Sequence, residues 1–424
     1  MYKRYTGLLA VVAVCTAFLF LAAPQHAEAQ ATVTADNGWS FTFTGNVNAF
    51  LVYESQSEDG EVGGPALVGA DEAEGSTIRT GLLPAFAQFE ANGTEGGVDV
   101  GVHFGFAPQI QTPGGHDNFQ ADGTAGAQID MREVYLTVAG DFGEILAGRA
   151  IGVYQRQNIL TDQTLMGVGA TGGNFGDPAG TTLGRIGFGY VYPNYNAQIA
   201  YTTPADNPAS LTVALFDPDT HNGFDETALP RLETEFSYSS GDFLGWVGGM
   251  VQYQKDTSLE DLEGDIDDSS TSAGVSGGLE YGGENFSLTG SGYWGEGIGT
   301  TLTFANARSS AAQAPGVPST ELRTSYGFIG QATVSPEGSD VTFGGSYGLS
   351  TLEAADDEVV FPETGGLEKV SNQSITGGIY ANLTESLMLN GEGTYQWSSG
   401  SIEEGDDPES NNSIVFAGGL MLFF

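Results

Sequence analysis

Apolar and polar residues alternate with a period of two along most of the chain. Between residues 39 and 53, apolar side chains such as Phe41 and Leu51 share one parity, and Ser, Thr and Asn residues take the other. Successive side chains of a strand point to opposite faces, so this pattern predicts strands with one apolar and one polar face. The same alternation returns at 98–106, 341–349 and 387–397. Beyond the first thirty residues no apolar run approaches the ~20 residues that a membrane-spanning helix needs.

Short connections rich in Gly, Asn, Asp and Pro alternate with long ones. The short ones fall at 92–96, 140–143, 203–208, 239–242, 282–285, 335–340 and 383–386, and the long ones at 55–77, 109–128, 152–194, 217–227, 256–271, 295–320, 351–371 and 398–412. On successive hairpins this alternation places all short turns at one end and all long loops at the other. Seven turns and eight long loops predict about sixteen antiparallel strands, an even number that closes a barrel. Eighteen strands remain the alternative.

A soluble β-sandwich also alternates, but three features favour a transmembrane β-barrel. The strands have the ~10-residue length that crosses a bilayer when tilted. Aromatic residues such as Trp39, Tyr53 and Trp294 lie near strand ends, as the interface girdles of membrane barrels do. The second face of each strand is polar or glycine, which suits water. We therefore predict an all-β, transmembrane antiparallel barrel.

The first 29 residues have the features of a cleaved signal peptide. Lys3 and Arg4 precede an apolar run from Leu8 to Ala23, and Ala27-Glu28-Ala29 has the small-x-small pattern of a cleavage site. An N-terminal membrane anchor is the alternative. With cleavage, Cys15 is lost, and residues 30–424 form a single barrel domain without any cysteine to form a disulfide.

The charge is strongly negative. The chain has 12 Lys and Arg against 54 Asp and Glu, and removal of Lys3, Arg4 and Glu28 leaves 10 against 53, a net charge of -43. Such a charge repels phosphate backbones and excludes nucleic-acid binding. The acids gather in the long loops, at 54–74, 256–268, 353–368 and 403–409. We expect them to line one rim of the barrel, concentrate cations there, and reflect a salty habitat.

Several segments resemble the general porins of Gram-negative outer membranes. Residues 132–152, REVYLTVAGDFGEILAGRAIG, are similar to the strand–turn–strand unit that precedes the constriction loop in that family. NAQIAYTTP at 196–204 resembles the next strand, and the terminal strand 413–424 ends on Phe424, an outward aromatic typical of the family. The resemblance implies an outer-membrane homotrimer whose third long loop, about 152–194, folds into the barrel.

In that family, acids on the inward loop face arginines on the barrel wall, and their field sorts solutes by charge. By position, the resemblance assigns the acidic role to Asp162 and Asp177 and the wall role to Arg132, Arg149 and Arg185, with Arg79 and Arg156 as weaker candidates. These five arginines are half of the ten basic residues that follow the signal peptide. The alternative is that Arg149 only pairs at a strand end and that Arg156 lies on a loop surface.

Other chemical signals are weaker. Residues 274–278 and 344–348 match the G-x-S-x-G pattern, but that nucleophile needs a strand-to-helix turn and both matches lie in strands. An outer-membrane hydrolase using Ser276 and His103 remains a second hypothesis. The acidic runs 217–221 and 261–268 lack the EF-hand spacing, so we predict no metal site and no cofactor, with weak divalent-ion bridging to lipopolysaccharide as an alternative.

The sequence thus predicts a general diffusion porin rather than an enzyme. Ions and small hydrophilic solutes would pass through a water-filled barrel with a preference for cations, and the partners would be outer-membrane lipid and lipopolysaccharide. A substrate-selective channel is a third hypothesis. A sugar channel would need inward aromatics where this chain has Ser, Thr, Asn and Gly, and a phosphate channel would need more lysines than Lys255 and Lys369.

Overall fold

The computed structural model describes most of the predicted barrel. The described residues are 31–57, 62, 65–69, 71–110, 129–172, 181–205, 207–219, 224–259, 268–309, 319–356, 368–401 and 409–424. The predicted signal peptide at 1–29 lies outside them, and so do Asp177 and most of the acidic run 261–268.

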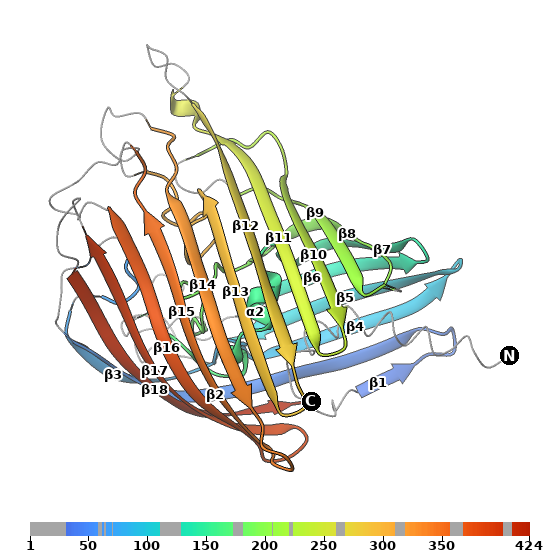
Figure 1. Ribbon diagram of the computed structural model, residues 1–424. Coiled ribbons are helices and arrows are strands. Elements are labelled where there is room, and N and C mark those ends of the chain that lie inside the picture. The colour runs from blue at the N-terminus through green and yellow to red at the C-terminus, as the bar shows by residue number, and fades with distance from the viewer. Residues whose placement is uncertain are drawn as a thin grey trace, which may run out of the picture.

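Within these residues nearly all of the regular structure is β-strand (Figure 1). The strands are β1 (Ala31–Thr34), β2 (Ser40–Gln56), β3 (Ala73–Arg79), β4 (Phe86–Glu95), β5 (Val98–Pro108), β6 (Ile129–Gly140), β7 (Gly143–Ile151), β8 (Tyr195–Thr202), β9 (Ala209–Phe216), β10 (Arg231–Ser240), β11 (Phe243–Lys255), β12 (Ser269–Gly282), β13 (Phe286–Glu296), β14 (Thr324–Val334), β15 (Val341–Glu353), β16 (Lys369–Asn382), β17 (Leu387–Ser401) and β18 (Glu409–Phe423). The helical elements are α2 (Arg156–Leu160) and two 3₁₀ turns, η1 (Gln163–Met166) and η2 (Thr257–Leu259). No helix among the described residues has the length and apolar character to cross a membrane.

The sheet closes on itself, because β18 pairs antiparallel with β2, from Phe423 opposite Asn46 to Ser413 opposite Gln56. The eighteen described strands fill sixteen positions in the barrel. β3 and β4 follow one another along the same edge of β2, and β1 lies on the edge that β2 otherwise shares with β18. The predicted barrel of about sixteen antiparallel strands is therefore confirmed.

The two faces of the strands also follow the prediction. In β2, Val47 and Leu51 are exposed, while Asn46, Asn48 and Glu54 are buried on the inner face. The last strand exposes its apolar side chains on the same outer surface, at Ile414, Phe416, Leu420 and Leu422. An apolar outer surface around a polar interior is the arrangement that a bilayer-spanning barrel requires.

The two rims differ as the connection lengths predict (Figure 1). Seven hairpins have connections of two to six residues, from β4–β5 to β16–β17, and eight longer connections join the opposite ends. Parts of three long connections fold back and pack inside the barrel. They are residues 62 and 65–69 before β3, 152–172 and 181–194 between β7 and β8, and 297–309 between β13 and β14.

One wall position is interrupted in a way that the sequence pattern did not predict. Residues 80–85, between β3 and β4, leave the ladder, and Pro84 in this break has no backbone N–H to offer a neighbouring strand. The Asn48 side chain replaces the missing partner, because it accepts from the Gly81 N–H at 3.0 Å and donates to the Leu83 carbonyl at 3.1 Å. The break then pairs with the inward segment, since the Leu82 N–H donates to the Gly167 carbonyl at 2.9 Å.

Candidate functional site: the barrel lumen

In the connection 152–194 between β7 and β8, the described residues 152–172 and 181–194 lie inside the barrel and include α2 and η1. At its neck the Gly152 N–H donates to the Asn194 carbonyl at 2.8 Å, which holds the two ends of the segment together. A Cβ at residue 152 would overlap the Pro193 carbonyl oxygen, so this close approach requires glycine. We call residues 152–194 the inward segment.

Two carboxylates of the wall hold the backbone of the inward segment. Glu233 on β10 accepts from the N–H groups of Val153 and Tyr154, both at 2.8 Å. Glu392 on β17 accepts from those of Val168 and Gly169, both at 2.7 Å. Each carboxylate thus satisfies two backbone donors that have left the sheet, and hydrogen bonds to a charged acceptor are the stronger kind.

Further contacts attach the remainder of the segment to the wall. On β2, Glu54 accepts from the Thr171 hydroxyl at 2.6 Å, and on β17 the Gln396 side chain accepts from the Thr171 N–H at 3.0 Å. On β11, the Trp246 Nε1 donates to the Asn158 side chain at 2.8 Å. Hydrogen bonds from both ends and the middle of the segment therefore reach strands on several sides of the lumen.

The sequence assigned Asp162 to the loop, and the structure places it there, fully buried as the N-cap of η1. Its carboxylate accepts from the Thr164 N–H at 2.8 Å and from the Tyr190 hydroxyl at 2.6 Å. Burial raises the pKa of Asp162, and the Tyr190 hydrogen bond and the charge of Arg185 oppose that rise. The hydrogen bonds of Asp162 therefore serve the internal structure of the segment, and the residue also lines a cavity between the segment and strands β12 to β17.

The wall position predicted for Arg185 is wrong. Arg185 lies in the inward segment, has no exposed surface, and donates to the carbonyl oxygens of Ser374 on β16 and Ser346 on β15, both at 2.8 Å. It follows Gly184, whose positive φ ends any strand that would begin there. Arg185 is thus an anchor from the segment to the wall, the reverse of the predicted arrangement.

The other predicted arginines occupy different surroundings. Arg79, at the end of β3, is buried on the inner face and donates to the Thr181 carbonyl of the inward segment at 2.7 Å. Arg156 in α2 pairs with Glu235 at 2.6 Å. Arg149 is exposed and lies opposite Val134 and Ala197, in the row of side chains that faces out of the barrel. That outward position does not fit the predicted pore role.

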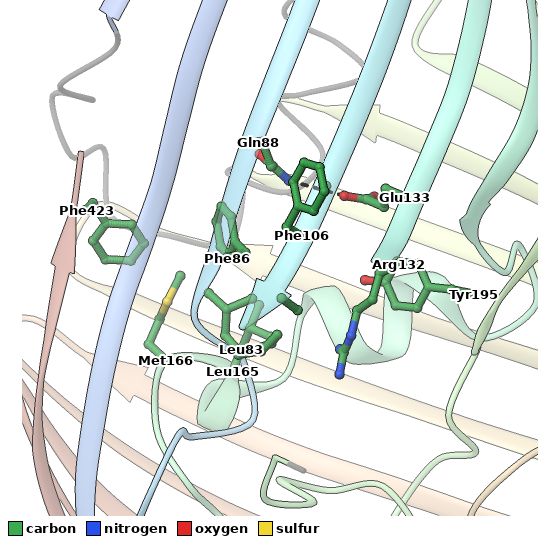
Figure 2. A pocket seen from close by; sticks show the side chains of 13 residues that line it. Leu83, Phe86, Gln88, Phe106, Arg132, Glu133, Leu165, Met166, Tyr195 and Phe423 are labelled. Atoms are coloured by element: carbon green, nitrogen blue, oxygen red, sulfur yellow. Dashed lines mark hydrogen bonds between the residues drawn. The ribbon is translucent and has the colours of Figure 1, made fainter. Parts of the chain in front are cut away.

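Among the predicted arginines, Arg132 lines a cavity in the lumen (Figure 2). It is the extra residue of a β-bulge, because Gly105 pairs with Glu133 and Phe106 pairs with Met131. Its Nε donates to Asp130 at 2.6 Å, and its guanidinium lies 5.7 Å from the centre of the Tyr195 ring. Figure 2 shows Arg132 and Glu133 on the wall and Leu165 and Met166 on the inward segment around this cavity.

A cluster on the wall beside this cavity was not apparent from the sequence pattern. His103 on β5 lies between Glu90 on β4 and Glu133 on β6, with Nδ1 at 3.2 Å and Nε2 at 3.1 Å from the carboxylate oxygens. Its ring stacks on Tyr135 at 4.6 Å with an interplanar angle of 6°. The signal was present, since all four residues occupy inner parity positions, but neighbouring strands must be put in register before they meet. No group of His, Cys, Asp and Glu in the described ranges has the arrangement of a metal site.

A comparison with protein families identifies the barrel. The model of the Gram-negative porin family matches residues 10–401. The chain belongs to the Gram-negative porin family. No curated protein sequence matches it.

Solved structures of outer-membrane proteins share the porin fold. The outer membrane channel DcaP of Acinetobacter baumannii is 15% identical, with a TM-score of 0.61, and the match covers 93% of this chain and 100% of DcaP. OmpT of Vibrio cholerae is 14% identical, with a TM-score of 0.54 over 93% of this chain and 100% of OmpT. OmpF of Salmonella typhi, in complex with daunomycin, is 11% identical, with a TM-score of 0.54 over 92% and 100%.

These findings decide the general class of the protein. The porin family and the closed sixteen-position barrel make the chain a channel of the Gram-negative outer membrane. The membership of the Gram-negative porin family that the sequence resemblance implied is therefore confirmed.

Proposed function

We propose that this porin is a passive channel for ions and small hydrophilic solutes, with a preference for cations. The proposal rests on how the basic side chains are paired or placed. All ten that follow the signal peptide lie in described residues, and six form ion pairs, namely Arg132, Arg156, Arg231, Lys255, Arg308 and Lys369. The surplus of acids therefore sets the sign of the field that a solute meets.

The four other basic side chains support the same conclusion. Arg79 and Arg185 are buried and donate to backbone carbonyls, Arg323 donates to the Asn306 carbonyl at 3.0 Å, and Arg149 lies on the outer face. We propose that the inward segment narrows the lumen and limits the size of solutes, since hydrogen bonds hold it across the barrel, to β10 and β11 on one side and to β17 and β2 on the other.

Reversal potentials across planar bilayers in a salt gradient test the charge preference. We expect the permeability ratio of potassium to chloride to exceed one, and a clear anion preference would refute the proposal. Swelling of liposomes in sugars of increasing size tests the passive pathway, for which the rate should fall smoothly with solute size. Saturation by one solute at low concentration would instead favour a substrate-selective channel.

We also propose that no chemical step accompanies transport. Ser276 lies in the middle of β12, opposite Gly248 and Tyr293, and Ser346 bonds to Arg185. Both ring nitrogens of His103 face carboxylates, so this histidine is not placed to activate a serine hydroxyl. Replacing Ser276 and His103 and assaying lipid hydrolysis would reveal an activity if one exists.

Assembly as a homotrimer is part of the proposal. The resemblance to general porins implies it, and OmpT of Vibrio cholerae has been solved in a trimer form. The outer surface would otherwise contact membrane lipid and lipopolysaccharide through exposed apolar residues such as Ile199 and Phe416. The mass of the detergent-solubilised protein by light scattering gives the number of subunits directly, and a monomeric mass would contradict this assembly.

A further inference from the structure

Glu90, His103 and Glu133 form a cluster on the inner wall of the barrel. It comes from three adjacent strands, β4, β5 and β6, whose register places Glu90 opposite His103 and Tyr135 on the other side of His103. The side chains of Glu90, His103 and Glu133 are 16%, 6% and 12% exposed, so the cluster is held tightly but still meets the lumen.

The hydrogen bonds define the charge of this cluster. An ionised carboxylate can only accept, and a neutral imidazole can donate from only one of its nitrogens. Because Nδ1 faces Glu90 and Nε2 faces Glu133, two donors are needed, and only the imidazolium supplies both. His103 then cancels one of the two negative charges and leaves the cluster with a net charge of -1.

The cluster borders the space between the wall and the inward segment. Glu133 lines the cavity shown in Figure 2, where it also accepts from the Gln88 side chain at 3.2 Å. Leu165 and Met166 form the opposite side of that cavity, which holds only a few water molecules. An ion in this space therefore lies beside the Glu133 carboxylate.

The nearby Arg132 does not cancel the negative charge of the cluster. Arg132 precedes Glu133 on β6, but its Nε donates to Asp130 and its guanidinium lies over Tyr195. The charged and titratable groups around the imidazole are therefore Glu90 from β4, Glu133 and Tyr135 from β6, and the neutralised pair of Arg132 and Asp130.

We propose that Glu90, His103 and Glu133 form a selectivity-determining cluster of this channel, in which His103 limits the attraction of the two carboxylates for cations. The inference rests on the proposed diffusion function. It assigns charge selection to the wall between β4 and β6 and gives the inward segment a mainly steric role.

Three substitutions that change the cluster charge in opposite directions test the proposal. His103→Gln keeps a polar side chain and changes the cluster charge from -1 to -2. At pH 5, where an imidazole of ordinary pKa (about 6.5) is protonated even without a carboxylate partner, Glu133→Gln changes it to zero, and Glu90→Gln combined with Glu133→Gln changes it to +1. One unit charge about 8 Å away in water alters the local cation concentration by about twofold. The cation-to-anion permeability ratio should therefore rise about twofold with His103→Gln, fall about twofold with Glu133→Gln, and fall further in the double variant.

A matched control removes the same charge far from the cavity. Glu337 is exposed in the short turn between β14 and β15, so Glu337→Gln should leave the permeability ratio nearly unchanged. Resistance of each barrel to unfolding in detergent at room temperature confirms that the variants are folded. A merely structural cluster would shift stability and conductance without this order of permeability ratios.

The pH profile provides a second, independent measurement. Loss of the second proton from His103 adds one negative charge, so the cation preference of the wild type should rise through that titration. His103→Gln should lack this step. An unchanged ratio in His103→Gln, or a fall with that substitution, would overturn the inference. Anion preference of the wild type would refute the proposed function, whereas the order among the variants would still judge the cluster.

Discussion

At the scale of single residues, the sequence identified the barrel interior correctly but assigned its charges incorrectly. Arg79, Arg132 and Asp162 do lie inside the barrel, yet Arg185 belongs to the inward segment and Arg149 faces outward. The position of Arg185 relative to a family motif could not show whether it lies on the wall, because that depends on whether residue 185 begins a strand. The positive φ values of Gly184 and Gly187 keep this stretch out of the sheet.

The sequence pattern also could not predict the partners of the wall carboxylates that hold the inward segment. Glu54, Glu233 and Glu392 occupy inner parity positions, so the alternation places them in the lumen, but it cannot say that backbone N–H groups of a distant segment meet them. A different signal was available. Apolar residues at inner positions, such as Phe50, Val52 and Val415, contact Val168, so they mark where the segment packs.

Glu392 provides a test of how the inward segment is held. Glu392→Gln should loosen the segment near Val168 and Gly169, because both N–H groups bond to one oxygen of Glu392 and a neutral amide oxygen accepts more weakly than a charged one. Hydrogen bonds to charged groups contribute about 1.5–3 kcal/mol, against about 0.5–1.5 kcal/mol for neutral ones. We expect a larger and noisier single-channel conductance with nearly unchanged thermal stability of the barrel, because the β17 ladders are intact. Single-channel recording measures the first effect and the temperature of gel-mobility change measures the second.

The control for this substitution lies in the hairpin that leads into the same strand. Glu385 is exposed in the turn between β16 and β17, so Glu385→Gln makes the same chemical change without touching the inward segment. Both variants giving the wild-type conductance would show that Glu392 does not hold the segment.

At the scale of elements, period-two alternation and connection length were sufficient to predict the strands. The predicted turns and long loops correspond to the seven short and eight long connections of the barrel. The exception is the position next to β2, where residues 80–85 divide the wall strand into β3 and β4. Gly81 and Pro84 are ordinary in a turn, so nothing in the local pattern distinguishes this break inside a wall from a rim connection.

Asn48 is the residue whose loss should reveal the importance of this break. In Asn48→Ala the Gly81 N–H and the Leu83 carbonyl lose their side-chain partner, and an unsatisfied buried polar group costs about 1–3 kcal/mol. We expect a lower unfolding temperature together with a changed conductance, since the break also pairs with Gly167 and Leu165. Heat-dependent gel mobility and bilayer recording report the two effects.

Asn92→Ala is the comparison for this prediction. Asn92 lies on the inner face of β4 and also loses its amide, but it is far along the strand from the break. Equal destabilisation by the two substitutions would contradict a special role for Asn48, and a change in stability without a change in conductance would separate the break from the inward segment.

At the scale of the whole molecule, acidic side chains of the described residues lie in two places that act differently on a passing ion. One is the rim with the long connections, where the described exposed acids include Asp71, Glu72, Glu74, Asp130, Asp217, Asp225, Glu226, Glu296, Glu321, Asp356 and Glu409. The other is the inner wall, where Glu90 and Glu133 flank His103. Composition alone gives the total number of acidic residues, but it does not show how many lie on the rim and how many on the inner wall.

Salt distinguishes the two contributions, because the Debye length falls from about 10 Å at 0.1 M to about 3 Å at 1 M. Acids on the open rim act through water and should lose most of their effect at 1 M, whereas a carboxylate beside a cavity of a few water molecules is screened much less. We therefore expect the cation preference to decline between these concentrations toward a residual value that still differs between wild type and His103→Gln. Replacing Asp71 by Asn and Glu72 by Gln should lower the preference at 0.1 M and leave it unchanged at 1 M. A preference that is independent of salt would show that the rim contributes little, and one that disappears at 1 M in every variant would assign all of the selectivity to the rim.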